Sequence, residues 1–372
     1  MIGKGLRIGL VGPLPPPSGG MANQTRQLAR LLAQEGVEVD MVQVNAPYRP
    51  QWVGSLRGVR ALFRLIPFLA NLWTTAGRVQ LFHVMANSGW AWHLCAAPAI
   101  WVARLRRVPV VVNYRGGYAE EFFAHSFFWV GPTMRLAQRL VVPSGFLHQV
   151  FARFGLSAEV VPNVIDLSRF APRAESSAAR PAAPHLVVTR NLEPIYDIGT
   201  ALRALAIVSR SRPAARMTIA GSGPERERLG ELARSLGVSD HVTFTGPLDN
   251  DRIGALYQQA DLFLNPSLVD NMPISILEAL ASGVPVVSTG VGGIPFLVEH
   301  RKTALLVAAQ DADGMAAALL ELLDDPAQAA RLARAGRDSV QQYAWPNVRG
   351  RLFDVYARVL QGTPAPAAAE IK

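Results

Sequence analysis

Two series of short apolar runs, separated by one low-complexity segment, constrain the fold of this chain more than any other feature. The first series is strand-like and alternates with helical patterns, with runs at 6–11, 37–44, 80–85, 108–113, 139–142 and 159–161. The second series repeats the alternation, with runs at 185–189, 216–220, 242–245, 262–265, 284–288 and 304–307. Strands that alternate with helices predict parallel sheets in an α/β fold.

The segment between the two series, residues 171–184, is rich in Ala, Pro, Ser and Arg, which is typical of a linker. A chain of 372 residues is long enough for two domains of ordinary size. We therefore expect two Rossmann-like domains, residues 1–170 and 185–345, facing a central cleft. Ligands of such folds bind at the carboxyl ends of the strands.

Cysteine, histidine and hydropathy patterns limit the class of protein. Cys95 is the single cysteine, which excludes an intrachain disulfide, and the seven histidines show no close pair at ligand spacing. No stretch reaches the roughly 18 apolar residues that a membrane span requires. The basic N-terminus resembles a signal peptide, but its apolar run leads directly into Gly12-Pro13, which is typical of a strand and turn. We expect a cytosolic protein without a metal site.

The chain carries a formal net charge of +9 and a pI near 10.3, so an acidic partner is expected. Nucleic acid, an anionic membrane surface and phosphorylated small molecules all meet this requirement. The sequence contains no zinc finger, aromatic RNA-binding signature or block of consecutive lysines, so nucleic acid is not expected.

The segment 265–283 is the most informative about function. Pro273 is tolerated in a first helical turn, apolar residues then recur at helical spacing, and Gly283 ends the pattern. Asp270 is expected just before this helix and Glu278 inside it. The helix end after Met272, with the amides of Ile274, Ser275 and Ile276, suits an anion such as a diphosphate. A helix with a capping Asp and a solvated Glu is the alternative.

Two other segments can contribute to a phosphate site. Gly19-Gly20 follows the first strand and precedes a helix expected over 23–34, so a ligand could approach the backbone closely. Arg190 ends the first strand of the second half, and its guanidinium matches phosphate oxygens. A plain turn remains the alternative for the glycines.

The stretch Gly221-Ser222-Gly223-Pro224 resembles part of a dinucleotide fingerprint. However, Arg226 occupies the third glycine position and Pro224 restricts the turn. We therefore do not expect a nicotinamide cofactor, or any other cofactor.

Taken in order, these motifs and three more resemble the family 4 retaining glycosyltransferases over residues 6–360, most specifically in the second half. The additional motifs are Pro162-Asn163-Val164-Ile165-Asp166, Phe244-Thr245-Gly246 and the run from Glu278 through Gly283 to Val287. The resemblance implies a GT-B fold, a nucleotide-diphosphate sugar donor and metal-independent transfer with retention of configuration. It also implies that the C-terminal helix, 346–362, crosses back onto the N-terminal domain.

The resemblance assigns roles to individual positions. Glu278 would bind the ribose hydroxyls, and Asp270 would replace a glutamate that holds the donor sugar. Arg190 and the Gly19–Gly20 backbone would hold the diphosphate. The base pocket would include Leu248, and the remaining donor-site positions would be Gly221, Met272, Pro273, Ile274 and Ser275.

Three positions depart from the family pattern. Tyr196 stands where a lysine is frequent, Arg115 follows the fourth strand where a histidine is frequent, and Asp270 is one methylene shorter than glutamate. We expect Arg190, Asp270 and Arg115 to be the catalytic residues. A structural Arg115 paired with Glu120 or Glu121 is the alternative.

The expected function is sugar transfer to a glycan or lipid-linked acceptor in bacterial envelope or exopolysaccharide synthesis. A non-catalytic nucleotide-sugar-binding subunit and a sugar-nucleotide epimerase remain as alternatives. Arg57, Arg60 and Arg64 fall within about 60° of one another on a helix and adjoin an apolar arc. This pattern, with Arg104, Arg106 and Arg107, indicates peripheral docking on the inner membrane face, unless the arc packs on the sheet.

Overall fold

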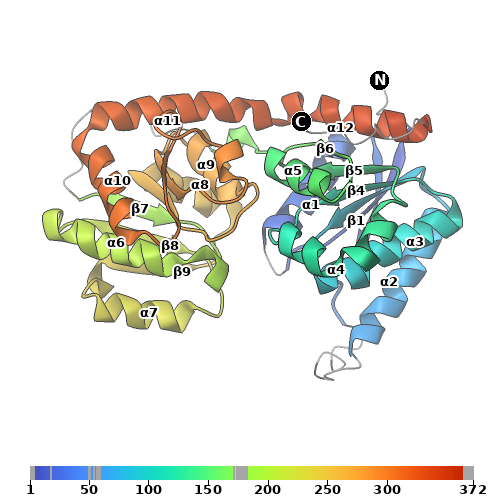
Figure 1. Ribbon diagram of the computed structural model, residues 1–372, viewed down its shortest axis with the longest axis horizontal. Coiled ribbons are helices and arrows are strands. Elements are labelled where there is room, and N and C mark those ends of the chain that lie inside the picture. The colour runs from blue at the N-terminus through green and yellow to red at the C-terminus, as the bar shows by residue number, and fades with distance from the viewer. Residues whose placement is uncertain are drawn as a thin grey trace. The chain divides into compact units, whose positions relative to one another are not determined.

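The computed structural model describes residues 5–16, 19–48, 52, 55, 60–170, 172 and 183–362, with the side chains of 60, 62, 250 and 251 excepted. The chain forms two compact units, one made of residues 1–163 and 348–372 and the other of residues 164–347 (Figure 1). Of the expected linker 171–184, only residues 172, 183 and 184 are among those described, and the tail 363–372 lies outside them.

The first unit contains a six-stranded parallel sheet in the order β2-β1-β3-β4-β5-β6. Its strands are β1 (Arg7–Gly12), β2 (Glu38–Gln43), β3 (Leu81–Ala86), β4 (Val110–Tyr114), β5 (Arg139–Val142) and β6 (Ala158–Val160). The three central strands β3, β4 and β5 are buried along their whole length, because helices cover both faces of the sheet.

On one face of the sheet, helices pack in one large apolar cluster. On the other face, the contacts include the buried polar residues His83 and Asn113. The helices are α1 (Gly20–Gln34), α2 (Arg60–Ala76), α3 (Ala97–Arg106), α4 (Ala119–Met134), α5 (Gly145–Arg153) and α12 (Trp345–Leu360), which belongs to this unit from Val348 onward. Leu72, Ile100, Phe123 and Phe151, from α2, α3, α4 and α5, share one core with the sheet. On α12, Tyr356 hydrogen-bonds His83 of β3.

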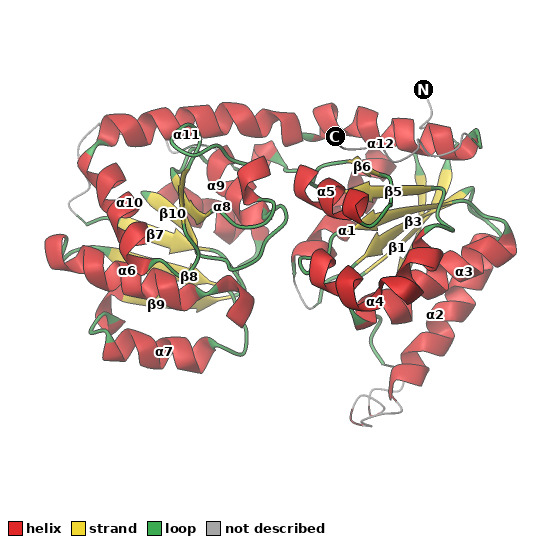
Figure 2. Ribbon diagram, viewed as in Figure 1, coloured by secondary structure: helices red, strands yellow, loops and turns green. Residues whose placement is uncertain are grey.

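The second unit contains another six-stranded parallel sheet, in the order β12-β11-β10-β7-β8-β9. Figure 2 labels its strands β10, β7, β8 and β9. Its strands are β7 (His185–Val188), β8 (Arg216–Ala220), β9 (Val242–Gly246), β10 (Leu262–Asn265), β11 (Val286–Thr289) and β12 (Leu305–Val307). Chain order therefore runs one way from β7 to β9 and the opposite way from β10 to β12. The order in which the chain adds strands to the sheet therefore reverses between β7 and β10, which are hydrogen-bonded parallel neighbours.

Two apolar clusters bury the faces of the second sheet. The helices of this unit are α6 (Ile198–Ser211), α7 (Arg226–Ser235), α8 (Asn250–Gln259), α9 (Ile274–Ala281), α10 (Ala312–Asp324) and α11 (Pro326–Val340). Leu202 of α6 and Leu319 of α10 lie in one cluster, whereas Tyr257 of α8 and Leu277 of α9 lie in the other. Each sheet is thus an α/β layer with helices on both faces, as the alternating pattern predicts.

The twelve expected strands are all present, with ends shifted by at most two residues. Helix α1 begins at Gly20 rather than at Asn23, because Gly19 takes an extended N-cap conformation and its carbonyl accepts from the Asn23 amide. Among the described residues, none of the helices is both long enough and apolar enough to span a bilayer.

Candidate active site

The carboxyl ends of β7 and β10 define the candidate site of the second unit. These strands are neighbours at the point where the strand order of the sheet reverses, which is where ligands of doubly wound sheets bind. The chain leaves β7 through Thr189 and Arg190, and it leaves β10 through the loop that leads to Asp270. Two residues 80 positions apart in sequence are brought together there because their strands are adjacent.

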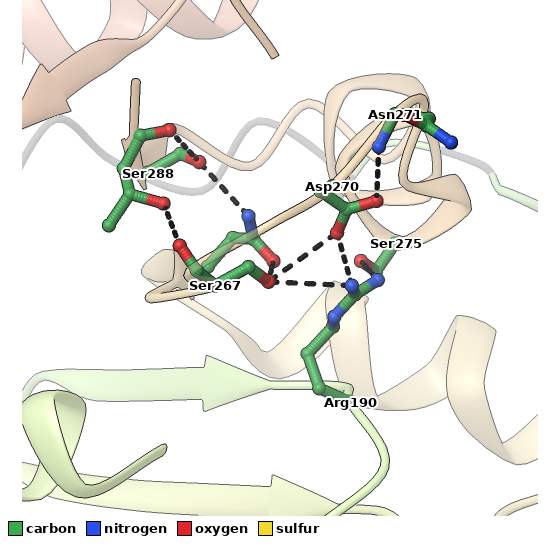
Figure 3. Close-up of polar contacts among 8 residues, drawn as sticks. Arg190, Ser267, Asp270, Asn271, Ser275 and Ser288 are labelled. Carbon is green, nitrogen blue, oxygen red and sulfur yellow. Dashed lines mark hydrogen bonds and ion pairs between the residues drawn. The ribbon is translucent and has the colours of Figure 1, made fainter. Parts of the chain in front are cut away.

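The Arg190 guanidinium is held by side chains from the β10 loop and from α9 (Figure 3). Its Nη2 donates to Asp270 Oδ2 and lies 3.4 Å from Ser267 Oγ, while Nη1 donates to Ser275 Oγ at 3.3 Å. The Arg190 and Asp270 side chains are only 11% and 12% exposed. The arginine is therefore fixed in one orientation before any ligand binds.

The ring of Tyr196 packs against the Arg190 guanidinium. The guanidinium carbon of Arg190 lies 4.0 Å from the centroid of the Tyr196 ring, a cation–π arrangement. Tyr196 belongs to a short 3₁₀ turn, Pro194–Tyr196, just after β7. At the position where the resembled family frequently has a lysine, this chain places an aromatic ring against its arginine.

Opposing effects act on the pKa of the Asp270 carboxylate. Burial raises its pKa above the usual range, and the Arg190 charge, the Asn271 amide and the Ser267 hydroxyl oppose that shift. The Asn271 amide donates to Asp270 Oδ1 at 3.0 Å. An unpaired buried carboxylate is costly, so Asp270 and Arg190 each compensate the desolvation of the other.

A chain of hydroxyl and amide groups supports the β10 loop from behind. Ser267 Oγ donates to Asn265 Oδ1 at 3.1 Å, and Asn265 Nδ2 donates to Ser288 Oγ at 3.1 Å. Thr289 Oγ1 donates to the Ser267 carbonyl at 2.6 Å. Ser267, Asn265, Ser288 and Thr289 are all fully buried, so the loop that carries Asp270 is tied to the ends of β10 and β11.

Helix α9 begins beside the arginine. Pro273 is its N-cap rather than its first helical residue, Met272 is buried in the core below, and Ile274 begins the helix. Ser275 is buried and faces Arg190. The Ile276 amide, expected to be free, instead donates to the Pro273 carbonyl at 3.2 Å, because the first turn is tightened.

Glu278 lies one turn further along α9 and is connected to the same cluster through Tyr257 of α8. The Tyr257 hydroxyl lies 3.1 Å from Glu278 Oε2, 3.1 Å from the Ser275 carbonyl and 2.6 Å from Thr189 Oγ1. Burial raises the pKa of Glu278 to about 7, against the opposing effects of the Tyr257 hydrogen bond and the Arg190 charge. Glu278 therefore titrates near neutral pH and is not a solvated surface carboxylate.

The glycines after β8 have a packing role. A Cβ on Gly221 would lie 2.0 Å from the Arg190 carbonyl oxygen, and one on Gly223 would lie 2.3 Å from that of Leu192. The Leu192 amide donates to the Ser222 carbonyl at 3.0 Å. Gly221 thus lets the backbone of the β8 loop support the segment that carries Arg190. Leu248, after β9, is half-buried against the α8–α9 core.

Gly19 and Gly20 lie at the start of α1 in the first unit. A Cβ added at either position would meet nothing within 4 Å, so packing does not require glycine there. The open backbone at the carboxyl end of β1 is compatible with close approach of a ligand.

Arg115 follows β4 in the first unit and is held by two asparagines. Its Nε donates to Asn113 Oδ1 at 3.2 Å, and its Nη1 donates to Asn163 Oδ1. Burial lowers the pKa of Arg115 to about 10. Glu120, one of the alternative partners expected for Arg115, pairs with Arg153 at 2.6 Å instead.

Gly116 is explained by packing and not by a ligand. A Cβ there would lie 2.2 Å from Ser88 Oγ and 2.7 Å from the Tyr114 hydroxyl. These two hydroxyls hydrogen-bond each other at 2.7 Å. The glycine therefore accommodates a buried Ser–Tyr contact beneath Arg115.

The sequence patterns missed several polar residues of these clusters. Ser267, Tyr257 and Thr189 contact the candidate site residues of the second unit, and His83 and Tyr356 extend the Arg115 cluster in the first. Ser267 could have been found from its position after a strand end. Tyr257 and Tyr356 lie on helices at core spacing and carried no such signal. No trio of His, Cys, Asp or Glu in the described ranges is arranged to hold a metal ion.

Comparisons with known proteins identify the family of this chain. Residues 18–169 match the model for Glycosyltransferase Family 4, and residues 174–339 match that for Glycosyl transferases group 1. Together these two matches cover most of the chain.

Among curated relatives, a GDP-mannose-dependent alpha-(1-6)-phosphatidylinositol monomannoside mannosyltransferase of Mycobacterium tuberculosis is 36% identical. That match covers 53% of this chain and 55% of the relative, so the chain spans about half the length of this relative. A glycogen synthase of the same organism is 31% identical over 73% of this chain and 69% of its own length.

Among solved structures, HepE of Anabaena in complex with UDP-glucose superposes with a TM-score of 0.73 at 18% identity, covering 94% of this chain and 99% of that one. Two parallel six-stranded Rossmann-like sheets and this likeness give the expected fold class. The chain belongs to the group 1, family 4 glycosyltransferases and has the GT-B fold.

Proposed function

We propose that this protein is a retaining glycosyltransferase that uses a nucleotide-diphosphate sugar as donor and requires no metal ion. The proposed acceptor is a glycan or a lipid-linked saccharide in bacterial cell-envelope or exopolysaccharide synthesis. The proposed location is the cytoplasm, at the inner face of the cell membrane.

The observation that carries this proposal is the fixed Arg190 guanidinium at the point where the strand order of the second sheet reverses. Asp270, Ser267, Ser275 and the Tyr196 ring hold the guanidinium beside the first turn of α9. When the bond from the sugar to the diphosphate breaks, negative charge grows on the phosphate oxygens. A cation that is already oriented stabilises that charge without further rearrangement.

The proposed transfer needs no dedicated general base. The bond between the anomeric carbon and the diphosphate oxygen breaks, and a bond from the acceptor oxygen to the same face of that carbon forms. The acceptor proton then moves to the departing phosphate oxygen. In this front-face mechanism, Arg190 stabilises the leaving group. Asp270 orients Arg190 and is proposed to contact the donor sugar.

Glu278, Leu248 and the glycines complete the proposed donor contacts. A carboxylate can accept hydrogen bonds from two neighbouring ribose hydroxyls, and Glu278 lies on the same helix as Ser275. Leu248 offers an apolar contact for the base, and Gly19–Gly20 offer open backbone for phosphate. Arg115 is proposed to supply a second cation for the diphosphate.

Relatives support the donor class. A similar protein is named for its use of GDP-mannose, and a similar structure holds UDP-glucose. The acceptor named for the mannosyltransferase is a phosphatidylinositol mannoside, which supports a lipid-linked acceptor for this chain.

A thermal-shift panel of UDP-, GDP- and ADP-sugars in the presence of EDTA tests the donor proposal, because a bound ligand raises the melting temperature by mass action. We expect one nucleotide class to raise it and the corresponding sugar to be hydrolysed slowly or transferred. Binding without hydrolysis or transfer would indicate a non-catalytic subunit, and an isomerised donor would indicate an epimerase. Activity that appears only after Mg²⁺ or Mn²⁺ is added would contradict metal independence.

A further inference from the structure

The positive charge of this protein is concentrated in one segment of its sequence. From Met41 to Ala119 there are nine arginines, no lysine and no aspartate or glutamate. The formal net charge of the whole chain is also +9, so basic and acidic residues balance everywhere else. This segment includes α2 and α3 and ends at the first residue of α4.

Exposed apolar side chains are concentrated in nearly the same part of the chain. In the described part of the chain, all large exposed apolar side chains except Phe296 and Leu360 belong to residues 52–129. Trp90, Phe128 and Trp129 are 78%, 80% and 73% exposed. Large apolar side chains that are this exposed mark an interaction surface where they gather on one part of a protein.

Most of these side chains lie on the outer faces of three neighbouring helices. Helix α2 contacts α3, and α3 contacts α4, so the three lie side by side over one face of the first sheet (Figure 1). Their inner faces are buried in the core of that unit. The exposed side chains, named here the α2–α4 face, are Phe63, Ile66 and Trp73 on α2, Trp90 and Leu94 on the helical segment that leads into α3, Trp101 and Leu105 on α3, and Phe128 and Trp129 on α4.

Helical spacing explains why these side chains point outward on α2 and α3. On α2, Phe63, Ile66 and Trp73 lie on one side, and the buried Phe68 and Leu72 lie on the opposite side. On α3, the exposed Trp101 and Leu105 are four residues apart. Their outward direction is therefore a property of the helices and not of isolated rotamers.

Arginines border these apolar side chains. Arg104, Arg106 and Arg107 are exposed at the end of α3, and the Arg106 guanidinium lies 4.8 Å from the centroid of the Trp73 ring. Arg64 of α2 lies 4.2 Å from the centroid of the Tyr48 ring. Of the docking helix expected from the sequence, Arg57 lies outside the described residues, and so does the side chain of Arg60.

We propose that the α2–α4 face docks on an anionic lipid bilayer, with its aromatic side chains in the interfacial region and its arginines on the lipid phosphates. Tryptophan and phenylalanine beside arginine are the side chains that favour the membrane interface. A second copy of the chain fits poorly, because a symmetric contact through this face would bring like charges together. Three of the nine side chains, Ile66, Leu94 and Leu105, are aliphatic, and aliphatic groups do not stack on nucleic-acid bases as aromatic rings do. None of the nine side chains of this face belongs to the proposed transfer site, and vesicle binding is measured without any turnover.

Flotation with lipid vesicles tests the charge component. The full chain should float with phosphatidylcholine vesicles that contain phosphatidylglycerol and much less with phosphatidylcholine alone, and binding should weaken as salt screens the charges. Replacing Arg104, Arg106 and Arg107 with glutamine should weaken binding roughly tenfold to a hundredfold, since each surface charge contributes to anionic lipid attraction. The matched control replaces Arg331, Arg334 and Arg337, three exposed arginines of α11, and should bind like the wild type.

The apolar component is tested by Trp101→Ala combined with Phe128→Ala. The control is Phe296→Ala in the second unit, where the side chain is 48% exposed, close to the 50% of Trp101. The double variant should bind anionic vesicles several-fold more weakly, and the control should not. Circular dichroism and melting temperature check that each variant is folded. Equal loss in the two arginine triples would mean nonspecific charge attraction and would overturn the proposal. A second result would also overturn the proposal. In that result the wild-type chain does not bind vesicles and forms an oligomer, which Trp101→Ala disperses.

Discussion

The imidazole of His83 and the hydroxyl of Tyr356 hydrogen-bond at 2.7 Å, although 273 positions separate them in the sequence. The bond continues a chain through Asn113 to Arg115. Because Arg115 Nε donates to Asn113 Oδ1, the Asn113 amide nitrogen faces His83 Nε2 at 3.1 Å and donates to it. The neutral ring must then carry its proton on Nδ1 and donate to Tyr356. Burial, aided by the Arg115 charge, lowers the pKa of His83 to about 3, which keeps the ring neutral.

Tyr356→Phe should destabilise the protein, because it leaves the buried Nδ1–H of His83 without an acceptor. We expect the free energy of unfolding to fall by about 1–3 kcal/mol, the cost of one unsatisfied buried donor. Urea denaturation followed by circular dichroism measures it. Tyr118→Phe, at an exposed tyrosine of the same unit, is the control. Equal stabilities for the two variants would show that the hydrogen bond has no net value.

Arg190→Ala should lower kcat by roughly 10²–10³, the range for loss of one preorganised donor at a developing charge. Arg190→Lys should recover only part of the loss, since an ammonium cannot contact Asp270, Ser267 and Ser275 in the same planar arrangement. Transfer kinetics under saturating donor measure the effect. Turnover equal to the wild type in a folded Arg190→Ala protein would remove Arg190 from the catalytic assignment.

Asp270 and Arg190 should show strong energetic coupling. Asp270→Ala alone leaves a buried guanidinium without its carboxylate, at a cost of about 3 kcal/mol in the free energy of unfolding. The same change in an Arg190→Ala background should cost much less, because no buried cation remains. A double-mutant cycle by chemical denaturation gives the coupling energy. Additive effects would mean that the pair contributes nothing beyond its separate packing.

Donor affinity should depend on pH through Glu278, whose pKa is about 7 against an ordinary value of 4.5. The ionised carboxylate is the better acceptor for ribose hydroxyls, so affinity for the nucleotide sugar should rise between about pH 6 and pH 8. Glu278→Gln should bind more weakly and show a flat profile. Isothermal titration across this range measures both, and the nucleotide sugar has no phosphate proton that titrates there. A wild-type profile as flat as that of the variant would contradict the prediction.

The stability consequence of the same shift has the opposite sign. A raised carboxyl pKa means that the folded protein binds the proton more tightly than the unfolded chain. The contribution of Glu278 to stability is therefore complete below its unfolded pKa and is lost as pH rises through the folded value of about 7. Relative to Glu278→Gln, the wild type should lose stability over that interval.

Arg115→Ala should reduce transfer roughly 10²-fold if Arg115 supplies a second cation to the diphosphate. Arg153→Ala, which removes an exposed arginine paired with Glu120 in the same unit, is the matched control and should retain activity. Both variants are compared by melting temperature and by kcat/KM for the donor. Full activity of a folded Arg115→Ala protein would assign Arg115 to the structural chain that leads to Tyr356.

The strands were predictable because fully buried parallel strands are continuous apolar runs, and Val110–Tyr114 and Leu262–Asn265 carry that signal. The start of α9 was predictable in outline from Pro273. Its details were not, because whether Pro273 is the N-cap or the first helical residue depends on the tight first turn that the Ile276 amide forms.

By itself, the sequence determined the two α/β halves and the family. It also determined that Arg190 follows a strand, that Asp270 precedes a helix and that Glu278 lies inside that helix. Apolar periodicity and turn chemistry are local, so they are legible along the chain. Only the tertiary structure decided that β7 lies next to β10, and therefore that Asp270 and Ser267 hold Arg190. It also decided that Tyr257 joins Glu278 to this cluster and that Tyr356 completes the chain from Arg115. Strand order and helix packing come from contacts between distant segments, whose partners no local pattern specifies.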